Sequence, residues 1–470
     1  PFKFRKFYLN KGLVLISSIF FIHALGLLYT DNMGYALADM RIKLPLLVIP
    51  ILFAGMPHLK KSGTHFLIKV FAVALLISTL FSFGNILLNK PEDLRDGIMF
   101  ISHIRLGLMI SFCLIYFVLC WAGENKIWKT LFIAMAGWFL LFMFYTHSAT
   151  GILTFGATFA ILALIWSLRN WNKLISKLAI PAILIIGIVG FLFLKNAYDD
   201  YFTLNETKEN LDEFTENGEP YYHIYERTFI ENGFFTDIYI APKELELAWN
   251  NSSVKDFKGL DNRGQNIEST VRRYMTSKGL RKDANGVSQL TEQDIKNIEN
   301  GFTNVNEPNR NAIDKKLNEL FYEWTAFENG ADPSGNSLFM RTEFWKNGWS
   351  LFKKNKWFGV GTGDIKDELD KEYEKNQTLL DKDHQYRVHN QYLAFAICFG
   401  IIGLLAICFC MYYPIITKKA DLLFLAFIII YSLSFLTEDT LETQAGVTFF
   451  AFFSSFFLSQ WRKDQSVWLR

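Results

Sequence analysis

An arginine lies inside an apolar segment that is otherwise suited to a membrane. Arg105 follows Ser102-His103-Ile104 in the apolar run 98–121, roughly 10 Å from the start of that run at 1.5 Å per residue. Burying a charge among lipid tails costs from about 2.5 to over 10 kcal/mol, so an arginine at this depth needs an anionic partner. A guanidinium can bind a phosphate through two hydrogen bonds, which predicts a phosphate clamp. The alternative is a structural ion pair with a carboxylate such as Glu438.

A histidine and an arginine lie where a long polar stretch re-enters an apolar one. The sequence there is Arg387-Val-His389-Asn390. Histidine titrates near neutral pH, which makes His389 a candidate general base for a hydroxyl group. The alternative is an interfacial histidine that is hydrogen-bonded to Asn390. Arg341 and Arg387 are further candidates for binding a phosphate.

A glycine-rich turn precedes this histidine. Gly359-Val-Gly361-Thr-Gly363-Asp follows an aromatic stretch in which Phe344 and Trp349 predict an amphipathic interfacial helix. The backbone N–H groups of such a turn could cradle a phosphate, and a simple tight turn is the alternative.

Two carboxylate pairs have the spacing of a divalent-ion site. They are Asp381 with Asp383 and Asp199 with Asp200. Both pairs lie in charge-rich stretches where solvated carboxylates are the rule, so we expect neither a catalytic metal nor a cofactor. All five cysteines lie within apolar runs, which argues against a disulfide framework and a thiolate metal site.

Membrane spans are the elements that must position these residues. The 470 residues are 51% hydrophobic with a net charge of +2, so charge gives no reason to expect a nucleic-acid partner. Apolar runs near 20 residues predict an all-α polytopic membrane protein with about ten transmembrane helices. The predicted spans lie near 12–29, 44–57, 66–88, 98–121, 127–145, 148–167, 174–194, 391–416, 421–437 and 444–461.

Lysine and arginine in alternate short loops predict the sidedness. They place both termini in the cytoplasm and the long polar segment outside, and no cleavage site follows the first span, which we therefore expect to be retained. The basic loops carry Lys60 and Lys61, Lys126 and Lys129, Arg169 to Lys177, Lys418 and Lys419, and Arg462 and Lys463. We expect an N-terminal transmembrane bundle at 1–194, a large, mostly helical outer domain at 195–388, and C-terminal transmembrane helices at 389–470.

The order of these motifs resembles the O-antigen ligase and O-antigen polymerase family. The resemblance covers about 341–404: Arg341, spaced tryptophans, the glycine-rich turn, His389-Asn390 and a glycine-containing span. Arg105 is similar to the membrane arginine of the family, and the long outer segment resembles a branch with an enlarged periplasmic domain. One departure is Ala149, where the family pattern often has arginine.

The resemblance implies a metal-independent, inverting glycosyltransferase of the C-type class in the bacterial inner membrane, with its active site facing the periplasm. It implies transfer of a glycan from a polyprenyl (undecaprenyl) diphosphate to an acceptor hydroxyl. The acceptor would be lipid A–core in lipopolysaccharide biosynthesis, a growing glycan or a protein, so ligase, polymerase and protein O-oligosaccharyltransferase all stay open. Arg105, Arg341 and Arg387 would bind the diphosphate and His389 would be the base. Asn390, Gly361 and Gly363 would support them.

Two interpretations without catalysis compete with this one. A lipid or glycan transporter could use Arg105 as a substrate or coupling site, but the sequence has no visible inverted repeat, and alternating access does not need a large outer domain. A scaffold of an envelope assembly would leave the joint presence of Arg105, Arg341 and His389 unexplained.

Overall fold

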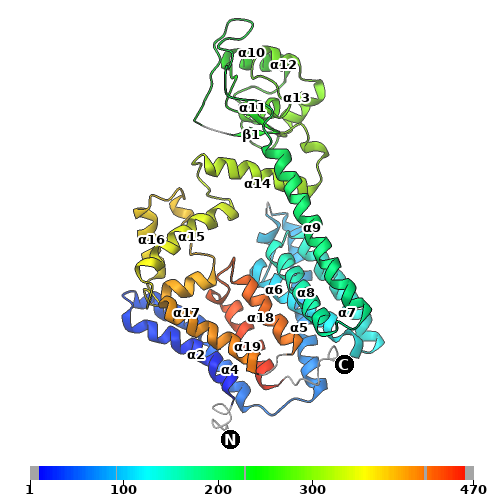
Figure 1. Cartoon of the computed structure of the whole chain (residues 1–470), viewed down its shortest axis with the longest axis vertical. Coiled ribbons are helices and arrows are strands. Elements are labelled where there is room, and N and C mark those ends of the chain that lie inside the picture. The colour runs from blue at the N-terminus through cyan, green and yellow to red at the C-terminus, as the bar shows by residue number, and fades with distance from the viewer. Residues whose placement is uncertain (1–9, 92, 227–228, 418–420, 461–470) are drawn as a thin grey trace. The chain divides into compact units, whose positions relative to one another are not determined.

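The computed structural model describes residues 10–91, 93–226, 229–417 and 421–460, and most of them are helical (Figure 1). Lys418, Lys419, Arg462 and Lys463, which the sequence predicts to lie on the cytoplasmic side, are outside the described residues. The chain forms two compact units. The first unit contains the residues up to Pro181, Arg341–Thr378 and those from Lys382 onward, and the second unit contains Ala182–Met340 and Leu379–Asp381. The predicted domains at 1–194, 195–388 and 389–470 were defined by the side of the membrane on which each segment lies. The packing of the chain does not test this, so the domain limits stay a prediction.

Within the described residues, seven helices are long and apolar enough to cross a membrane, which confirms the prediction of an all-α polytopic membrane protein. They are α2 with η1 (Lys11–Leu25, Gly26–Tyr29), α5 (Lys61–Asn89), α6 with η3 (His103–Cys120, Trp121–Gly123), α7 (Lys126–Tyr145), α8 (Ala149–Arg169), α9 (Leu174–Phe202) and α17 (Gln391–Thr417). The remaining three predicted spans are shorter helices: α4 (Pro45–Gly55), α18 (Leu422–Ser434) and α19 (Gln444–Ser459).

The helices of the first unit pack through aromatic side chains. Helices α2, α4, α17 and α19 lie side by side, and α18 lies beside α6 and α8 (Figure 1). Phe112 of α6 is fully buried, and its ring centroid lies 4.6 Å from that of Phe453 on α19 and 5.7 Å from that of Phe427 on α18. These rings pack tilted or edge to face, which adds specific contacts to the burial of apolar surface. The packing fixes the helix ends that carry the polar residues.

Helix α17 is broken at a glycine. Gly400 has φ 64° and ψ −171°, which no helical residue adopts. Beside the break, the N–H of Val360 donates to the carbonyl of Ile397 and the N–H of Gly361 to that of Cys398, both at 2.9 Å. The glycine-rich turn therefore satisfies carbonyl groups that the break leaves open, as an apolar environment requires.

The same turn is also bound to the segment after α2. The N–H of Gly363 donates to Thr30 Oγ1 at 2.9 Å, and the carboxylate of Asp364 accepts from the N–H groups of Asp31 at 2.8 Å and Asn32 at 2.7 Å. The N–H groups of Gly361 and Gly363 are thus used within the fold. These two N–H groups are therefore not available to bind a phosphate, and the glycine-rich turn is a tight turn that holds the fold together.

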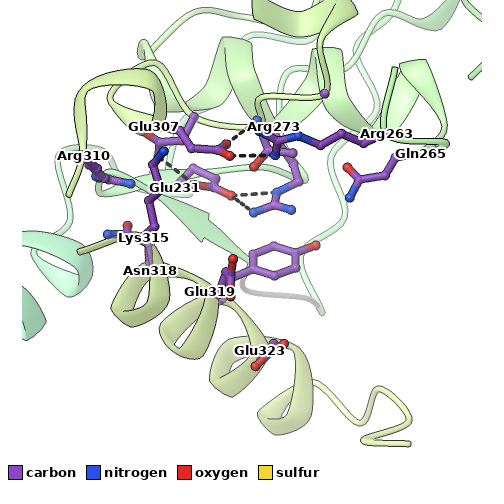
Figure 2. A pocket seen from close by; sticks show the side chains of 14 residues that line it. Glu231, Arg263, Gln265, Arg273, Glu307, Arg310, Lys315, Asn318, Glu319 and Glu323 are labelled. Carbon is purple, nitrogen blue, oxygen red and sulfur yellow. Dashed lines mark hydrogen bonds and ion pairs between the residues drawn. The ribbon is translucent and has the colours of Figure 1, made fainter. Parts of the chain in front are cut away.

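The second unit contains a two-stranded antiparallel hairpin, β1 (Ile230–Glu231) and β2 (Phe234–Phe235). Glu231 is 2% exposed and accepts a hydrogen bond from Nε of Arg273 on α11 (Ile267–Ser277) at 2.7 Å (Figure 2). This ion pair joins the hairpin to the helical part of the unit.

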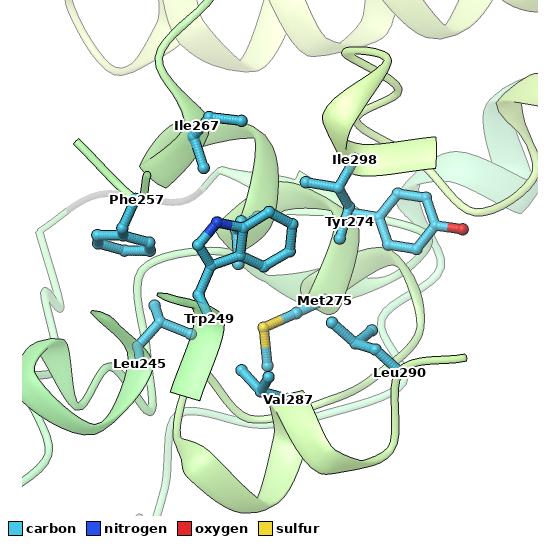
Figure 3. Close-up of a cluster of buried hydrophobic side chains, with 10 residues drawn as sticks. Leu245, Trp249, Phe257, Ile267, Tyr274, Met275, Val287, Leu290 and Ile298 are labelled. Atoms are coloured by element: carbon cyan, nitrogen blue, oxygen red, sulfur yellow. The ribbon is translucent and has the colours of Figure 1, made fainter. Parts of the chain in front are cut away.

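The helical part of the second unit has its own hydrophobic core. Figure 3 shows Trp249 of α10 (Pro242–Ser252), which is fully buried, among apolar residues of α11, α12 (Ala284–Ser288) and α13 (Glu292–Glu299). Helix α13 begins with a capping box formed by Thr291 and Asp294. The other elements of the second unit are η4 (Glu307–Asn309) and α14 (Ala312–Glu328), and α15 (Ser337–Lys354) begins in it and continues into the first unit. The first unit also contains α3 (Met33–Lys43), η2 (Leu94–Gly97), α16 (Ile365–Lys375), η5 (Lys382–His384) and η6 (Thr440–Glu442).

We predict that Gly400→Ala destabilises the protein. A Cβ at this position would lie 2.1 Å from the carbonyl oxygen of Trp357, and alanine disfavours the positive φ. Backbone strain of this kind costs about 1–3 kcal/mol, before the steric clash is added. Thermal unfolding in detergent measures the loss. The matched control is Gly137→Ala in α7, where a Cβ meets nothing within 4 Å. Equal unfolding temperatures for the two variants would contradict the role of the break.

Candidate functional site

Three residues that the sequence singled out surround one carboxylate of the first unit. Glu438 is 1% exposed, and its Oε1 accepts a hydrogen bond from Nη2 of Arg341 at 2.7 Å. Its Oε2 lies 3.9 Å from Nη1 of Arg105 and 3.5 Å from Nδ1 of His389. The fold thus brings Arg105, Arg341 and His389 together, although Arg105 and His389 are 284 positions apart in the sequence.

Four different elements supply these side chains. Arg105 lies in the first turn of α6, Arg341 on α15 and His389 just before α17, whereas Glu438 lies between α18 and η6. Both arginines also bind the backbone beside Glu438. Nη2 of Arg105 donates to the carbonyl of Asp439 at 2.9 Å, and Nε of Arg341 donates to that of Thr437 at 3.2 Å. The loop that carries Glu438 is therefore fixed on both sides.

The backbone of His389 is held in an uncommon conformation. Its φ is 45°, in the left-handed region, which a residue other than glycine seldom adopts. The N–H groups of His389 and Asn390 donate to the two carboxylate oxygens of Asp439 at 3.2 and 3.0 Å. The imidazole ring stacks on Phe344, with 5.5 Å between the ring centroids. Hydrogen bonds and stacking together fix where the imidazole points.

The position of Glu438 selects one tautomer of His389. A proton on Nδ1 faces the carboxylate, so the lone pair lies on Nε2; this is assigned from the partner group. In the part of the chain that the structure describes, no group hydrogen-bonds to Nε2, and the side chain is 34% exposed. An imidazole held in this way can accept a proton at Nε2 while the carboxylate stabilises the resulting charge.

Asn390 has a role in the fold. Its Oδ1 accepts a hydrogen bond from the N–H of Leu393 at 3.0 Å, and its Nδ2 donates to the carbonyl of Leu436 at 3.1 Å. The first contact caps the start of α17 and the second holds the loop after α18. Asn390 therefore supports the position of its neighbour His389.

A second ionic network lies next to the first. Lys43 is fully buried, and its Nζ donates to Glu442 at 2.6 Å and to Asp39 at 3.1 Å. Nη2 of Arg387 lies 3.3 Å from Oε2 of the same Glu442, and its Nη1 donates to the hydroxyl of Tyr35 at 3.1 Å. Arg387 is thus already bound within this network.

The pKa values of these carboxylates reflect a competition between burial and nearby cations. Burial would raise the pKa of Glu438, but the adjacent histidine and the two arginines outweigh burial and lower it. Burial likewise opposes ionisation of Glu442, but Arg387 and Lys43 hold its pKa well below the usual value. Burial raises the pKa of Asp39 to about 6. Glu438 and Glu442 are therefore ionised at neutral pH.

Reasoning from the sequence did not assign four residues of these networks. Asp439 and Glu442 follow Glu438 in an acidic turn, and that cluster of charges was the available signal. Asp39 and Lys43 lie where opposite charges cancel, which hides them from a count of loop charges. Their spacing of four residues on a helix was the signal that predicts an ion pair.

Within the described parts of the chain, no group of three or more histidine, cysteine or acidic side chains is arranged to hold a metal ion. In the acidic pair Asp199–Asp200, Asp199 is bound by Lys195.

We predict that Glu438→Gln lowers the stability of the protein. Removing one member of a buried ion pair leaves the other charges without compensation, which typically costs about 3–5 kcal/mol. Thermal unfolding in detergent measures the effect. Asp93→Asn is the matched control, because Asp93 pairs with Arg95 at an exposed position and such pairs contribute about 0–1 kcal/mol. If Glu438→Gln loses no more stability than the control, the stability of the protein does not depend on the Glu438 carboxylate.

A comparison with protein families identifies one region of the chain. Residues 290–408 match the family model described as O-Antigen ligase. The matched range contains Arg341, Arg387, His389 and the glycine-rich turn, whereas Arg105 and Glu438 lie outside it. No curated protein matches the chain. The match confirms the family resemblance drawn from the motifs: residues 290–408 of this polytopic membrane chain are similar to the O-antigen ligase family, a family of glycosyltransferase-like ligases.

Proposed function

We propose that the protein is a metal-independent, inverting glycosyltransferase that moves a glycan from a polyprenyl diphosphate to an acceptor hydroxyl. The observation that carries this proposal is the arrangement of His389, Arg105 and Arg341 around the buried Glu438. A histidine backed by a carboxylate suits proton removal, and two adjacent arginines suit a diphosphate. The family match supports the choice of glycan transfer.

In the proposed reaction, Nε2 of His389 takes the proton of the acceptor hydroxyl. The hydroxyl oxygen forms a bond to the anomeric carbon while the bond from that carbon to the diphosphate oxygen breaks. Direct displacement inverts the anomeric configuration. Glu438, at 3.5 Å from Nδ1, stabilises the imidazolium that forms, and His389 then releases the proton to water.

The two arginines would bind the diphosphate as it leaves. Arg105 donates one hydrogen bond to the backbone, but its Nε is buried and has no hydrogen-bond partner among the described residues. Such an N–H gains a partner when an anionic oxygen binds beside it. Because Glu438 already orients both guanidinium groups, little reorganisation accompanies the development of negative charge on the leaving group.

We assign a positioning role to the second network. Arg387 lies 3.9 Å from Oδ2 of Asp439, the carboxylate that accepts from the N–H groups of His389 and Asn390. Lys43 and Glu442 hold Arg387 in turn. In this proposal Arg387 acts on the base through Asp439, and the cap at Asn390 and the turn at Gly361 and Gly363 stabilise the surrounding backbone.

We further propose that the active site faces the periplasm from the bacterial inner membrane, with both termini in the cytoplasm and 195–388 outside. Lipid A–core is the proposed acceptor, and a growing glycan or a protein hydroxyl is the alternative. Mass analysis of envelope glycans with and without the gene product separates these acceptors. Glycan that accumulates on its lipid carrier inside the cell, and not outside, would favour a flippase and contradict the transferase.

Arg105→Ala should abolish transfer, and Arg105→Lys should retain little activity. An ammonium group cannot reproduce the two-point contact of a guanidinium with a phosphate. Glycan attachment in membranes that contain equal amounts of each variant is the measurement. The control is Arg95→Ala, since Arg95 forms an exposed pair and should be dispensable. Glycan attachment by Arg105→Ala at the level of the Arg95 control would remove Arg105 from the mechanism.

His389→Ala should lower turnover by roughly 10²–10⁴-fold, the usual contribution of a positioned proton transfer. Binding of the polyprenyl diphosphate donor should persist, because both arginines remain. Purified protein in nanodiscs, with a defined lipid-linked glycan, allows donor binding and product formation to be measured separately. His58→Ala, at an exposed position, is the control. Loss of donor binding with unchanged turnover at saturating donor would show that His389 binds the donor and is not the base.

A further inference from the structure

A cavity of about 500 Å³ lies in the first unit, at one end of three neighbouring membrane helices. Helices α5, α6 and α7 pack against one another. The first three turns of α5, the end of α6 and the residues around the start of α7 line the cavity. Its volume lies within the range of sites that hold a small molecule or the polar part of a larger one.

The cavity is at the far end of α6 from the candidate functional site. Arg105 lies in the first turn of α6, whereas Cys120, the last residue of this helix, lines the cavity. The two residues are 15 positions apart, which is about 22 Å along a helix at 1.5 Å per residue. This length covers most of a hydrocarbon layer of about 30 Å. The cavity therefore lies toward the opposite face of the membrane, at the end whose basic loops are predicted to be cytoplasmic.

Positive charge exceeds negative charge in this cavity. Among the described residues that line it, Lys61 and Lys69 are the lysines and Glu124 is the carboxylate. Lys69 is 9% exposed, and its Nζ donates to Oε2 of Glu124 at 2.6 Å. A further carboxylate near Cys120, that of Asp421, accepts from the N–H of Leu423 at 2.8 Å and caps α18. The lining thus carries one more cation than carboxylates.

The surroundings of the cavity add to this positive charge. Lys60 precedes Lys61 in the chain, and Lys126 and Lys129 lie on either side of Trp128, which lines the cavity. None of these three flanking lysines forms an ion pair with a carboxylate of the described residues. Basic pockets between membrane helices, on the cytoplasmic side, bind the headgroups of anionic lipids.

Two uncharged groups of the lining are available as hydrogen-bond donors. In the part of the chain that the structure describes, neither the hydroxyl of Ser62 nor the indole N–H of Trp128 forms a hydrogen bond. Nζ of Lys69 lies 4.4 Å from the centroid of the Trp128 ring, which holds the ring beside the ion pair. A tryptophan in such a place is typical of the headgroup level of a membrane.

An apolar face of α5 leads away from the cavity. Phe66 lines the cavity and is 64% exposed, and Val70, Val73 and Ile77 follow it at helical spacing with exposed side chains. A ligand with a polar head and an apolar tail can therefore place its head among the lysines and its tail along this face. A small soluble anion would leave the apolar face without a partner.

We propose that this cavity binds the headgroup of an anionic phospholipid such as phosphatidylglycerol. Lys61 and Ser62 bind the phosphate, Lys69 adds positive charge, and an acyl chain lies along α5 from Phe66. The lipid comes from the leaflet opposite the candidate functional site. This binding site does not depend on the proposed transfer reaction.

The test measures lipid binding to the full chain by native mass spectrometry in a neutral detergent. Wild type should bind dioleoyl-phosphatidylglycerol roughly 10-fold more tightly than dioleoyl-phosphatidylcholine, which has the same chains and no net charge. Lys61→Gln should weaken binding of phosphatidylglycerol by roughly 5-fold, the usual contribution of one basic residue near an anionic lipid. Lys11→Gln is the matched control and should bind as wild type does, because Lys11 is an exposed lysine in the first turn of α2 and does not line the cavity.

A second variant should change the affinity in the opposite direction. Glu124→Gln removes the carboxylate of the lining and leaves the charge of Lys69 uncompensated. Phosphatidylglycerol should therefore bind more tightly to this variant than to wild type, with the affinity for phosphatidylcholine unchanged. Because damage to the fold does not produce a gain of affinity for one lipid alone, this result separates the role of charge from a loss of structure.

Two further measurements identify the ligand and separate this site from catalysis. Inorganic phosphate at equal concentration should not displace phosphatidylglycerol, because it has no apolar tail to lie on α5. His389→Ala should bind phosphatidylglycerol as wild type does, whatever its effect on glycan transfer. The proposal is overturned by equal affinity of wild type for the two lipids, by Lys61→Gln that binds as tightly as Lys11→Gln, by weaker binding to Glu124→Gln, or by displacement of the lipid by phosphate.

Discussion

A buried carboxylate stays ionised only where cations and hydrogen-bond donors replace the water it has lost, and Glu438 is 1% exposed. Arg341 donates to it directly, and Arg105 and His389 lie at 3.9 and 3.5 Å from its second oxygen. The need for compensation applies to the buried cations as well as to the carboxylate. The membrane arginine needs an anion as much as the carboxylate needs a cation, so α6, α15 and the start of α17 must meet at one loop.

The second network extends this dependence to the N-terminal helices. Lys43, fully buried, compensates Glu442, which also holds Arg387. Replacing a buried ionic network by apolar residues is often neutral or stabilising in proteins, so stability alone does not explain why charges lie here. A function that needs the imidazole and guanidinium groups in fixed positions explains it, because each network restricts the backbone that carries them.

Buried and partly buried carboxylates of the second unit are also compensated by cations. Glu231 and Glu307 are matched by Arg273 and Arg263, as Glu438 is matched in the first unit. Both carboxylates line a polar cavity of the second unit (Figure 2), and Glu319 and Glu323 also line this cavity, so its four carboxylates equal its four cations in number.

The sequence alone determined the features that depend on local composition. Span length and apolar runs predicted the membrane helices. Arg105 was recognised because a charge in an apolar run is costly wherever the run folds. The tertiary structure alone decided which groups share a carboxylate and that the break at Gly400 receives the glycine-rich turn. The tertiary structure also revealed that Lys43 is buried. The sequence does not show this, because acidic residues nearby in the chain balance the charge of Lys43. Such pairings join residues far apart in the chain, and their energies depend on distance and burial, which packing fixes and residue order does not.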